Sequence, residues 1–492
     1  MSPDFFDADQ REGPRDECGV FGVFAPGHDV SRLAYFALYA LQHRGQESAG
    51  IAAADHGGHI MTRRELGLVN QVFSENDLRT LSGDLAIGHV RYSTTGSNAW
   101  ENSQPVQRSV GTHGSRREVA LGHNGNLINA VALHDELSER GVTFSSTSDS
   151  EIIAALIATH PAERIEDAIA AVLPRLEGAF SIVVMTKDRV VAFRDPHGLR
   201  PLALGAIEAP ANGDGRVRYC VASESCAFDI IGAKLLRDVE PGEMVSLSAE
   251  GLESRQVVSG KRRALCVFEH IYFARPDSRM GGQVLQVVRG RMGEILAREA
   301  PAQADLVIPV PESGNPAARG YARASGLPQD DGFVKNRYVA RTFIQPGQEL
   351  RKHGLRMKFN PLPDVVAHKR LVVVDDSIVR GNTTRQIVQM LRDAGAREIH
   401  LRISAPPIMH PCHYGIDMST SEEMIAHGRT VAEVAQELGC DSLSYLSLAG
   451  VYEAVQGSRD GHCDACFSGE YPVTGTDEAQ GKYALELPLV NA

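Results

Sequence analysis

The sequence lacks any uninterrupted apolar run of about 18 residues, the length that a membrane-spanning helix needs. Its first 17 residues have no apolar stretch of the kind found in secretory signals, and six of them are acidic. Basic residues are also few, because 50 Lys and Arg face 62 Asp and Glu, for a formal net charge of −12. That balance argues against a dedicated nucleic-acid-binding protein. We therefore expect a cytoplasmic protein that binds neither membranes nor nucleic acids.

Cysteine is scarce, with eight residues among 492, and only Cys463 and Cys466 are close neighbours. In a cytoplasmic chain such cysteines indicate catalysis or metal binding rather than disulfide bonds. The chain is too long for one ordinary hydrophobic core, so two large domains are expected.

Short apolar runs alternate with glycine-rich turns between Cys18 and about Gly260. Five runs are typical of strands, at residues 18–25, 84–93, 118–126, 179–186 and 189–196. Two segments, at residues 31–43 and 149–160, carry apolar residues at three- and four-residue spacing, which predicts helices. This pattern favours stacked sheets covered by helical layers.

After Gly260 the pattern changes to unbroken apolar strands that lead into helices. Strands are predicted over residues 305–310, 370–376 and 398–404, and helices from Ala317 and over residues 383–396. Such an order predicts a parallel sheet covered on both faces. We place the domain boundary near residue 260, with a second domain over residues 261–472 and a polar tail over residues 473–492 that wraps the surface.

The segment before Cys18 has two interpretations. Residues 1–17 bury too little apolar surface to be ordered. They are either a solvated tail ahead of a strand with a buried cysteine, or a propeptide whose removal leaves Cys18 as the first residue. In the second case the free α-amino group, with a pKa near ~8, can act as the base that activates the thiol.

Four polar motifs follow Cys18 in the first half of the chain. They are HRGQ at residues 43–46, GHVRYST at 88–94, GHNGN at 122–126 and SDSE at 148–151. Together with Cys18 they resemble the glutaminase domain of the N-terminal-nucleophile amidotransferases over residues 18–260. That resemblance implies a four-layered αββα sandwich.

The same resemblance implies roles for five residues. Cys18 is the nucleophile, Arg91 binds the α-carboxylate of glutamine and Asp149 its α-amino group. The side chain of Asn124 and the backbone N–H of Gly125 form the oxyanion hole. These residue types suit the chemistry, because an arginine fork matches a carboxylate and two preorganised donors stabilise a tetrahedral oxyanion.

The most specific run in the second half is LVVVDDSIVRGNTT at residues 371–384. A buried strand there delivers two carboxylates to a sheet edge, where open α/β folds bind ligands. A loop rich in glycine and hydroxyl groups then leads into a helix, whose N-terminus favours phosphate. Asp375 and Asp376 alone are equally typical of a strand end followed by a helix cap. With the loop, the run resembles the phosphoribosyl pyrophosphate signature of the type I phosphoribosyltransferases.

This second resemblance implies that Asp375 and Asp376 hold the ribose hydroxyls and Mg²⁺. The loop that follows would bind the 5′-phosphate through Ser377, Arg380, Gly381, Thr383 and Thr384. Asn382 stands where relatives have threonine, and since its amide still donates, we expect a small effect.

Two further segments belong to the same expected site. Ser313, in the PESGNP run at residues 311–316 that resembles a pyrophosphate loop, is implied to lie near Mg²⁺. The segment at residues 335–358 carries seven Lys or Arg against one Glu. It is either an exposed basic loop or, beside a pyrophosphate site, a mobile lid that neutralises the leaving group.

Four cysteines resemble those that bind a 4Fe–4S cluster in the iron–sulfur branch of the glutamine phosphoribosylpyrophosphate amidotransferases. They are Cys266, Cys412, Cys463 and Cys466. Their spacing alone permits Zn²⁺ equally well. The other three, Cys220, Cys226 and Cys440, are interpreted as small buried residues.

The two halves together resemble the iron–sulfur, propeptide-bearing branch of the glutamine phosphoribosylpyrophosphate amidotransferases. The resemblance implies a glycosyltransferase of purine biosynthesis that makes 5-phosphoribosylamine, glutamate and pyrophosphate. It also implies a homotetramer inhibited by purine nucleotides. Another glutamine amidotransferase, such as a hexosamine-phosphate synthase, would explain only the first half. A phosphoribosyl-fold regulator would explain only the second.

Overall fold

The computed structural model describes residues 18–92, 97–111, 117–208, 215–336, 358–416, 418, 420–473 and 485–486. The expected propeptide, most of the basic segment at 335–358 and most of the tail after residue 473 lie outside these residues. So do the last two residues of the GHVRYST motif. Within the described part, no helix is long and apolar enough to cross a membrane.

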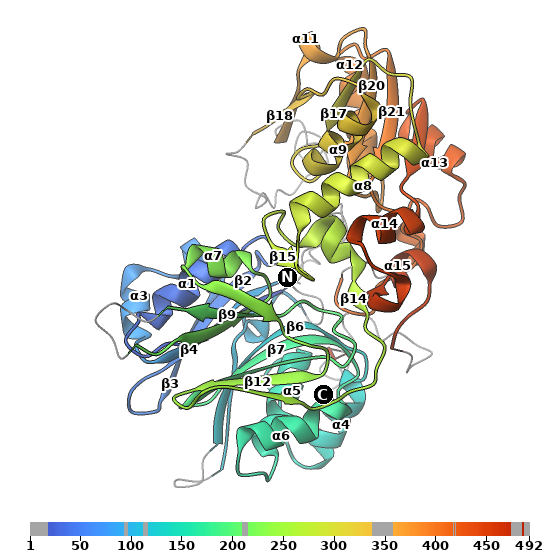
Figure 1. Cartoon of the computed structure of the whole chain (residues 1–492). Helices are drawn as coiled ribbons and strands as arrows, with labels where there is room; N and C mark the ends of the chain where they lie inside the picture. Colours follow the sequence, from blue (N-terminus) through green and yellow to red (C-terminus); the bar gives the residue numbers. More distant parts are fainter. Residues whose placement is uncertain are drawn as a thin grey trace, which may run out of the picture.

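Two antiparallel sheets packed face to face make up the first half of the chain (Figure 1). The larger has the strand order β11 (Lys234–Asp238), β9 (Ala203–Ile207), β10 (Arg218–Ala222), β1 (Gly19–Phe24), β4 (Leu85–Arg91), β2 (Ser48–Ala54) and β3 (Ile60–Leu66). The smaller has the order β13 (Gly251–Gln256), β12 (Glu243–Ser248), β8 (Arg189–Arg194), β7 (Gly178–Met185), β6 (Arg117–Leu127) and β5 (Val106–Val110). Strands such as β1 and β7 are apolar on both faces because each sheet is covered on both sides.

Helices cover the outer faces of this sandwich. Those on the larger sheet are α1 (Val30–Ala40) and α7 (Cys226–Ile230), with the short α2 (Val69–Val72) and α3 (Glu75–Thr80) at its edge. Those on the smaller sheet are α4 (Ala130–Glu139), α5 (Asp149–Thr159) and α6 (Ile165–Val172). The αββα architecture expected for the first half is confirmed.

The second half is built on a four-stranded parallel sheet with one continuous core. Its order is β17 (Leu306–Pro309), β20 (Arg370–Asp375), β21 (Glu398–Ile403) and β22 (Ser442–Tyr445). The helices of this half are α8 (Leu285–Glu299), α9 (Asn315–Ser325), α11 (Pro363–Val366), α12 (Asn382–Asp393), α13 (Val431–Leu438), α14 (Leu448–Val455) and α15 (Ala465–Ser468). The parallel α/β fold is therefore also confirmed. The helix predicted from Ala317 begins two residues earlier, since Pro316 is tolerated in a first helical turn.

Three two-stranded sheets complete the second half. They pair β14 (Leu265–Cys266) with β23 (His462–Cys463), β15 (Arg279–Met280) with β16 (Gln283–Val284), and β18 (Phe333–Lys335) with β19 (Phe359–Pro361). The first pair joins the start of this half to its end, near the first half (Figure 1).

The two halves meet beside β6. The Asn126 Nδ2 group donates to the His413 carbonyl oxygen at 3.0 Å, and the Arg200 Nε group donates to the Tyr414 carbonyl oxygen at 3.0 Å. A Cβ atom on Gly415 would lie 3.1 Å from the carbonyl carbon of Gly125. The loop at residues 412–415 therefore packs directly against the strand that carries the expected oxyanion hole.

Candidate active sites

The thiol expected to be the nucleophile lies directly before β1 and is buried. A small cavity of about 10 Å³ is lined by Cys18, Arg91, Gly125 and Asp149. The Sγ atom of Cys18 donates to the carbonyl oxygen of Tyr92 at 3.2 Å. Burial raises the pKa of the Cys18 thiol to about 11, although the nearby Arg91 cation opposes the shift. At neutral pH the thiol is therefore protonated, and it needs a base before it can attack.

Arg91 and Asp149 approach this cavity from different elements. Arg91 ends β4, and its Nη2 group donates to the Ser97 carbonyl oxygen at 3.3 Å. Asp149 begins α5 and accepts the Leu127 N–H at 3.0 Å, while His123 Nδ1 lies 3.5 Å from its Oδ1 atom. Burial raises the pKa of Asp149, but His123 and the backbone donors outweigh it, so the net pKa is lowered. One buried cation and one buried anion thus face the thiol.

The two expected oxyanion donors are consecutive residues of β6. Among the described residues, the buried Nδ2 atom of Asn124 has no hydrogen-bond partner. An unsatisfied buried donor costs free energy, so it is best explained by an acceptor that arrives with the substrate. Gly125 has a φ of +147°, and a Cβ there would lie 1.9 Å from the Ala179 carbonyl oxygen. Only glycine fits. Gly125 lines the small cavity, whereas Asn124 is the residue before it.

A larger cavity of about 550 Å³ opens at the carboxyl ends of β17 and β20. The residues expected in the phosphoribosyl site all line it, namely Ser313, Asp375, Asp376, Ser377, Arg380, Gly381, Thr383 and Thr384. Parallel strands place their carboxyl ends at one edge of the sheet, which explains why residues about sixty positions apart meet there.

Asp375 and Asp376 form a buried acidic pair at the end of β20. The Asp376 N–H donates to Asp375 Oδ1 at 2.9 Å. Burial, and next the charge of Asp376, raises the pKa of Asp375 well above its usual value. Burial also raises the pKa of Asp376, against hydrogen bonds from the hydroxyls of Ser313 and Ser377. Two buried carboxylates that repel each other are suited to bind a divalent cation. Hard cations such as Mg²⁺ prefer oxygen ligands of this kind.

The expected phosphate loop turns at Gly381 into α12. Gly381 has a φ of +79°, and a Cβ there would lie 2.4 Å from Ile425 Cδ1, so glycine is required. Arg380 forms an ion pair with Glu423. Asn382 is exposed and does not line the cavity, and its Oδ1 atom accepts from Arg385 Nη1 at 3.3 Å. That position accords with the small effect expected of Asn382.

The four matching cysteines gather where β14 pairs with β23. Cys266 and Cys463 are register partners in that pair, and Cys466 follows in α15. All four thiols are free, and burial raises the pKa of Cys463 to about 12, helped by the charge of Cys412. Among the described residues, no three His, Cys, Asp or Glu side chains are placed to hold a metal ion together. The donor types fit iron–sulfur or zinc chemistry alike, because both take thiolates.

Comparisons with known proteins address the whole chain. Residues 89–228 match the family model of the glutamine amidotransferase domain. An amidophosphoribosyltransferase of Synechococcus elongatus is 49% identical over 483 residues, which cover 97% of this chain and 96% of that protein.

The chain belongs to the amidophosphoribosyltransferase family.

Solved structures agree with this assignment. A glutamine phosphoribosylpyrophosphate amidotransferase from Bacillus subtilis, complexed with ADP and GMP, is 45% identical with a TM-score of 0.86, over 94% of this chain and 98% of that one. A structure described as the allosteric regulatory enzyme of purine biosynthesis has 45% identity and a TM-score of 0.88, over 95% and 99%. The expected family, enzyme class and fold are confirmed, and neither half-chain alternative explains a match of this length.

Several residues that line the larger cavity were not predicted from the sequence to lie there. Arg289, on α8, lines it, and so do His43 and Arg275 from the border of the two halves. The Arg289 side chain is 4% exposed and its Nη2 group donates to the Ala274 carbonyl oxygen at 2.6 Å. Burial lowers its pKa, and Asp376 opposes that shift. The one signal in the sequence was an arginine between apolar residues of a helix.

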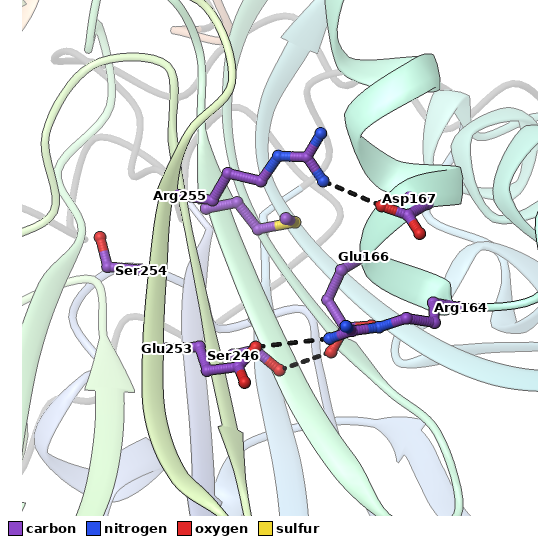
Figure 2. A pocket seen from close by; sticks show the side chains of 8 residues that line it. Arg164, Glu166, Asp167, Ser246, Glu253, Ser254 and Arg255 are labelled. Atoms are coloured by element: carbon purple, nitrogen blue, oxygen red, sulfur yellow. Dashed lines mark hydrogen bonds and ion pairs between the residues drawn. The ribbon is translucent and has the colours of Figure 1, made fainter.

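Another hollow, of about 440 Å³, lies away from both sites between α6 and the strands β12 and β13 (Figure 2). Its charged side chains neutralise each other, since Arg255 Nη1 lies 2.9 Å from Asp167 Oδ1 and Arg164 Nη2 lies 3.4 Å from Glu253 Oε2. No chemistry is assigned to it.

Proposed function

We propose that the family's reaction is divided in this chain between the Cys18 cavity and the Asp375–Asp376 cavity. Glutamine is hydrolysed at the first, and the ammonia released there attacks phosphoribosyl pyrophosphate at the second. The products are 5-phosphoribosylamine, glutamate and pyrophosphate. The observation that carries this division is that Cys18, Arg91, Gly125 and Asp149 line one cavity, while the expected phosphoribosyl residues line a separate one.

In the first step, the Cys18 sulfur attacks the carboxamide carbon of glutamine after its proton passes to a base. Arg91 binds the α-carboxylate and Asp149 binds the α-ammonium group, because each offers the opposite charge. Asn124 Nδ2 and the Gly125 N–H stabilise the oxyanion. The tetrahedral intermediate expels ammonia and leaves a thioester, which water hydrolyses to glutamate.

The base in this step is the α-amino group of Cys18 itself. The thiol has a raised pKa while residues 1–17 precede it. Removal of those residues creates an amine with a pKa near ~8 beside the sulfur, well suited to accept the thiol proton near neutral pH. Residues 1–17 are accordingly a propeptide.

In the second step, ammonia attacks C1 of the ribose as the bond to pyrophosphate breaks. Asp375 and Asp376 would hold the ribose hydroxyls and Mg²⁺, and a bound Mg²⁺ would supply positive charge to the leaving pyrophosphate. The loop from Ser377 to Thr384 binds the 5′-phosphate near the N-terminus of α12. Positive charge develops on the sugar as the leaving group departs, so the anionic pair also stabilises the transition state.

Two further properties belong to the proposal. The four cysteines at the β14–β23 pair would hold a 4Fe–4S cluster, which would tie the two ends of the second half together. The enzyme is a homotetramer, and purine nucleotides inhibit it. Nucleotide binding is supported by the similar Bacillus subtilis structure, which is in complex with ADP and GMP.

Replacement of Cys18 with alanine tests the division. Synthesis from glutamine should vanish, while synthesis from ammonium salts persists, since the second site needs only ammonia. A chain that begins at residue 18 should be used, so that an uncleaved propeptide does not confuse the result. Glutamine-dependent synthesis that survives in the variant would refute the nucleophile. Loss of both activities in a well-folded variant would refute two separable sites.

A further inference from the structure

Leu485 and Glu486, the two described residues after Val473, pack against the glutaminase half. Leu485 is 8% exposed and belongs to the apolar core between the smaller sheet and its helices. With Phe144 and Ile152 it lines a cavity of about 500 Å³ next to the Cys18 site. The contact is therefore a packed one, although the sequence analysis expected only a polar tail on the surface.

Glu486 bridges two segments that border the glutamine site. Its Oε1 atom accepts the Ser97 N–H at 2.6 Å and the Thr147 hydroxyl at 3.4 Å. The same two segments are also joined by Asn102, whose Nδ2 group donates to the Ser97 carbonyl oxygen at 2.9 Å and whose Oδ1 atom accepts the Thr147 N–H at 3.0 Å. Ser97 is thus held from both sides.

Ser97 in turn contacts the residue proposed to bind glutamine. The Ser97 carbonyl oxygen accepts from Arg91 Nη2 at 3.3 Å, so a continuous set of hydrogen bonds runs from Glu486 through Ser97 to the Arg91 guanidinium. The Glu486 charge also opposes the lowering of the Arg91 pKa by burial. Both effects act on the same side chain.

We propose that Glu486 is a positioning residue for glutamine, which fixes Ser97 and through it the orientation of Arg91. This rests on the proposed role of Arg91 as the ligand of the glutamine α-carboxylate. Glu486, Ser97 and Arg91 do not line the larger cavity, where phosphoribosylamine would form, so ammonia-dependent synthesis should be independent of the contact. The C-terminal segment then contributes to glutamine affinity from outside the cavity.

Steady-state kinetics of E486A, E486Q and the matched control E470A test this inference on the full enzyme. Glu470 is another carboxylate late in the chain, and it pairs with Arg459 Nη2 at 2.7 Å. Within the described part of the chain it has no hydrogen bond or ion pair with Arg91, Ser97 or Thr147. We expect E486A to raise the KM for glutamine about tenfold, or ~1.4 kcal/mol, with little change in kcat. E486Q keeps an acceptor for the Ser97 N–H and should raise the KM for glutamine less than E486A does. E470A should have the same KM and kcat as the wild type.

The rate of Cys18 labelling by a glutamine-analogue affinity reagent provides a second readout, which should fall in E486A in parallel with the KM effect. An unchanged or lowered KM for glutamine in E486A would overturn the inference. So would an equal loss of ammonia-dependent synthesis, which would indicate a general structural role. Failure of the proposed function would look different, because the wild-type enzyme itself would then not use glutamine.

Discussion

The guanidinium of Arg44 joins the two halves of the molecule by donating from Nη2 to the Glu269 carboxylate at 2.5 Å. Its Nη1 group donates to Glu224, and its Nε group donates to the carbonyl oxygen of Cys18 at 3.2 Å. Both carboxylates are fully buried, and the Arg44 side chain is 1% exposed. One cation therefore pairs with two buried anions and also donates a hydrogen bond to the backbone of Cys18.

Replacement of Arg44 with methionine should destabilise the protein strongly. It removes the arginine partner of the buried Glu269 carboxylate and leaves Glu224 with His43, which lies 2.7 Å away. Loss of one partner of a buried ion pair costs about 3–5 kcal/mol. Glu269→Gln should cost less, because Arg44 still pairs with Glu224. Calorimetry at a fixed scan rate checks the order. The exposed Arg32, paired with Asp29 at 2.8 Å, provides the control R32M, which should leave the transition in place. Equal transitions for R44M and R32M would contradict the assignment.

Local signals were enough to predict many of the elements. The run at residues 118–126 became β6 and the one at 370–376 became β20, because apolar runs bounded by turn residues form buried strands in most contexts. Candidate site residues could also be predicted from the sequence where they lie in a few short motifs. Gly125 and Gly381, for example, stand where a side chain would collide with its neighbours.

The contacts between distant segments could not be predicted in the same way. Glu224, Glu269 and Arg289 are single charged residues in ordinary helical or turn sequences, and only the tertiary fold buries them together. Their pairing partners are up to 225 positions away along the chain. Leu485 and Glu486 likewise belong to a tail with no periodic pattern, and their contacts depend on the tertiary fold of the first half.

Conversion of Asp375 and Asp376 to asparagine together should abolish synthesis from both glutamine and ammonia. The change keeps the shape of the site but removes the two charges that we propose bind Mg²⁺ and stabilise the developing sugar cation. Labelling of Cys18 by glutamine analogues should persist, since that site is separate. Product formation and labelling are measured on one preparation. Near-normal ammonia-dependent synthesis in the double variant would rule out the assigned role.

Serine at Cys463 should remove a ligand of the proposed cluster and yield colourless, less stable protein. A metal centre at the β14–β23 pair closes a long loop, so its loss affects the whole second half. Cys440→Ser is the matched control and should keep both colour and iron, because the Cys440 thiol donates to the Ala435 carbonyl oxygen at 3.5 Å and is not one of the four expected ligands. Iron and zinc assays on anaerobically purified protein decide the metal. Stoichiometric zinc without iron would contradict the cluster.

Reactivity of the Cys18 thiol should depend on pH differently before and after cleavage. With residues 1–17 attached, its pKa of about 11 leaves roughly one thiol in ten thousand ionised at pH 7. The alkylation rate should therefore rise about tenfold per pH unit up to that pKa. In a chain that starts at Cys18, the rate should level off near pH ~8, where the α-amino group becomes a free base. Peptide mapping by mass spectrometry measures both, and identical profiles would argue against the α-amino group as the base.

Asn124→Ala should lower kcat for glutamine without a matching change in KM. The Nδ2 group has no partner among the described residues, so its removal costs the ground state little. The oxyanion that forms in the transition state would lose one of two donors, an effect of about 10²–10³-fold in other enzymes with such a site. Asn129→Ala is the control. Its Nδ2 group donates to the Arg175 carbonyl oxygen at 2.9 Å, beyond the end of β6, and its loss should leave kcat unchanged.

Comparison of Asn124→Ala with Asn129→Ala also separates an effect on catalysis from an effect on folding. Ammonia-dependent synthesis should stay at the wild-type level in Asn124→Ala, because no atom of Asn124 lines the phosphoribosyl cavity. A thioester that forms slowly but is hydrolysed to glutamate would locate the defect in the attack on the amide. If KM rises while kcat holds, the side chain binds glutamine in the ground state instead, and the oxyanion hole must be formed by other donors around Gly125.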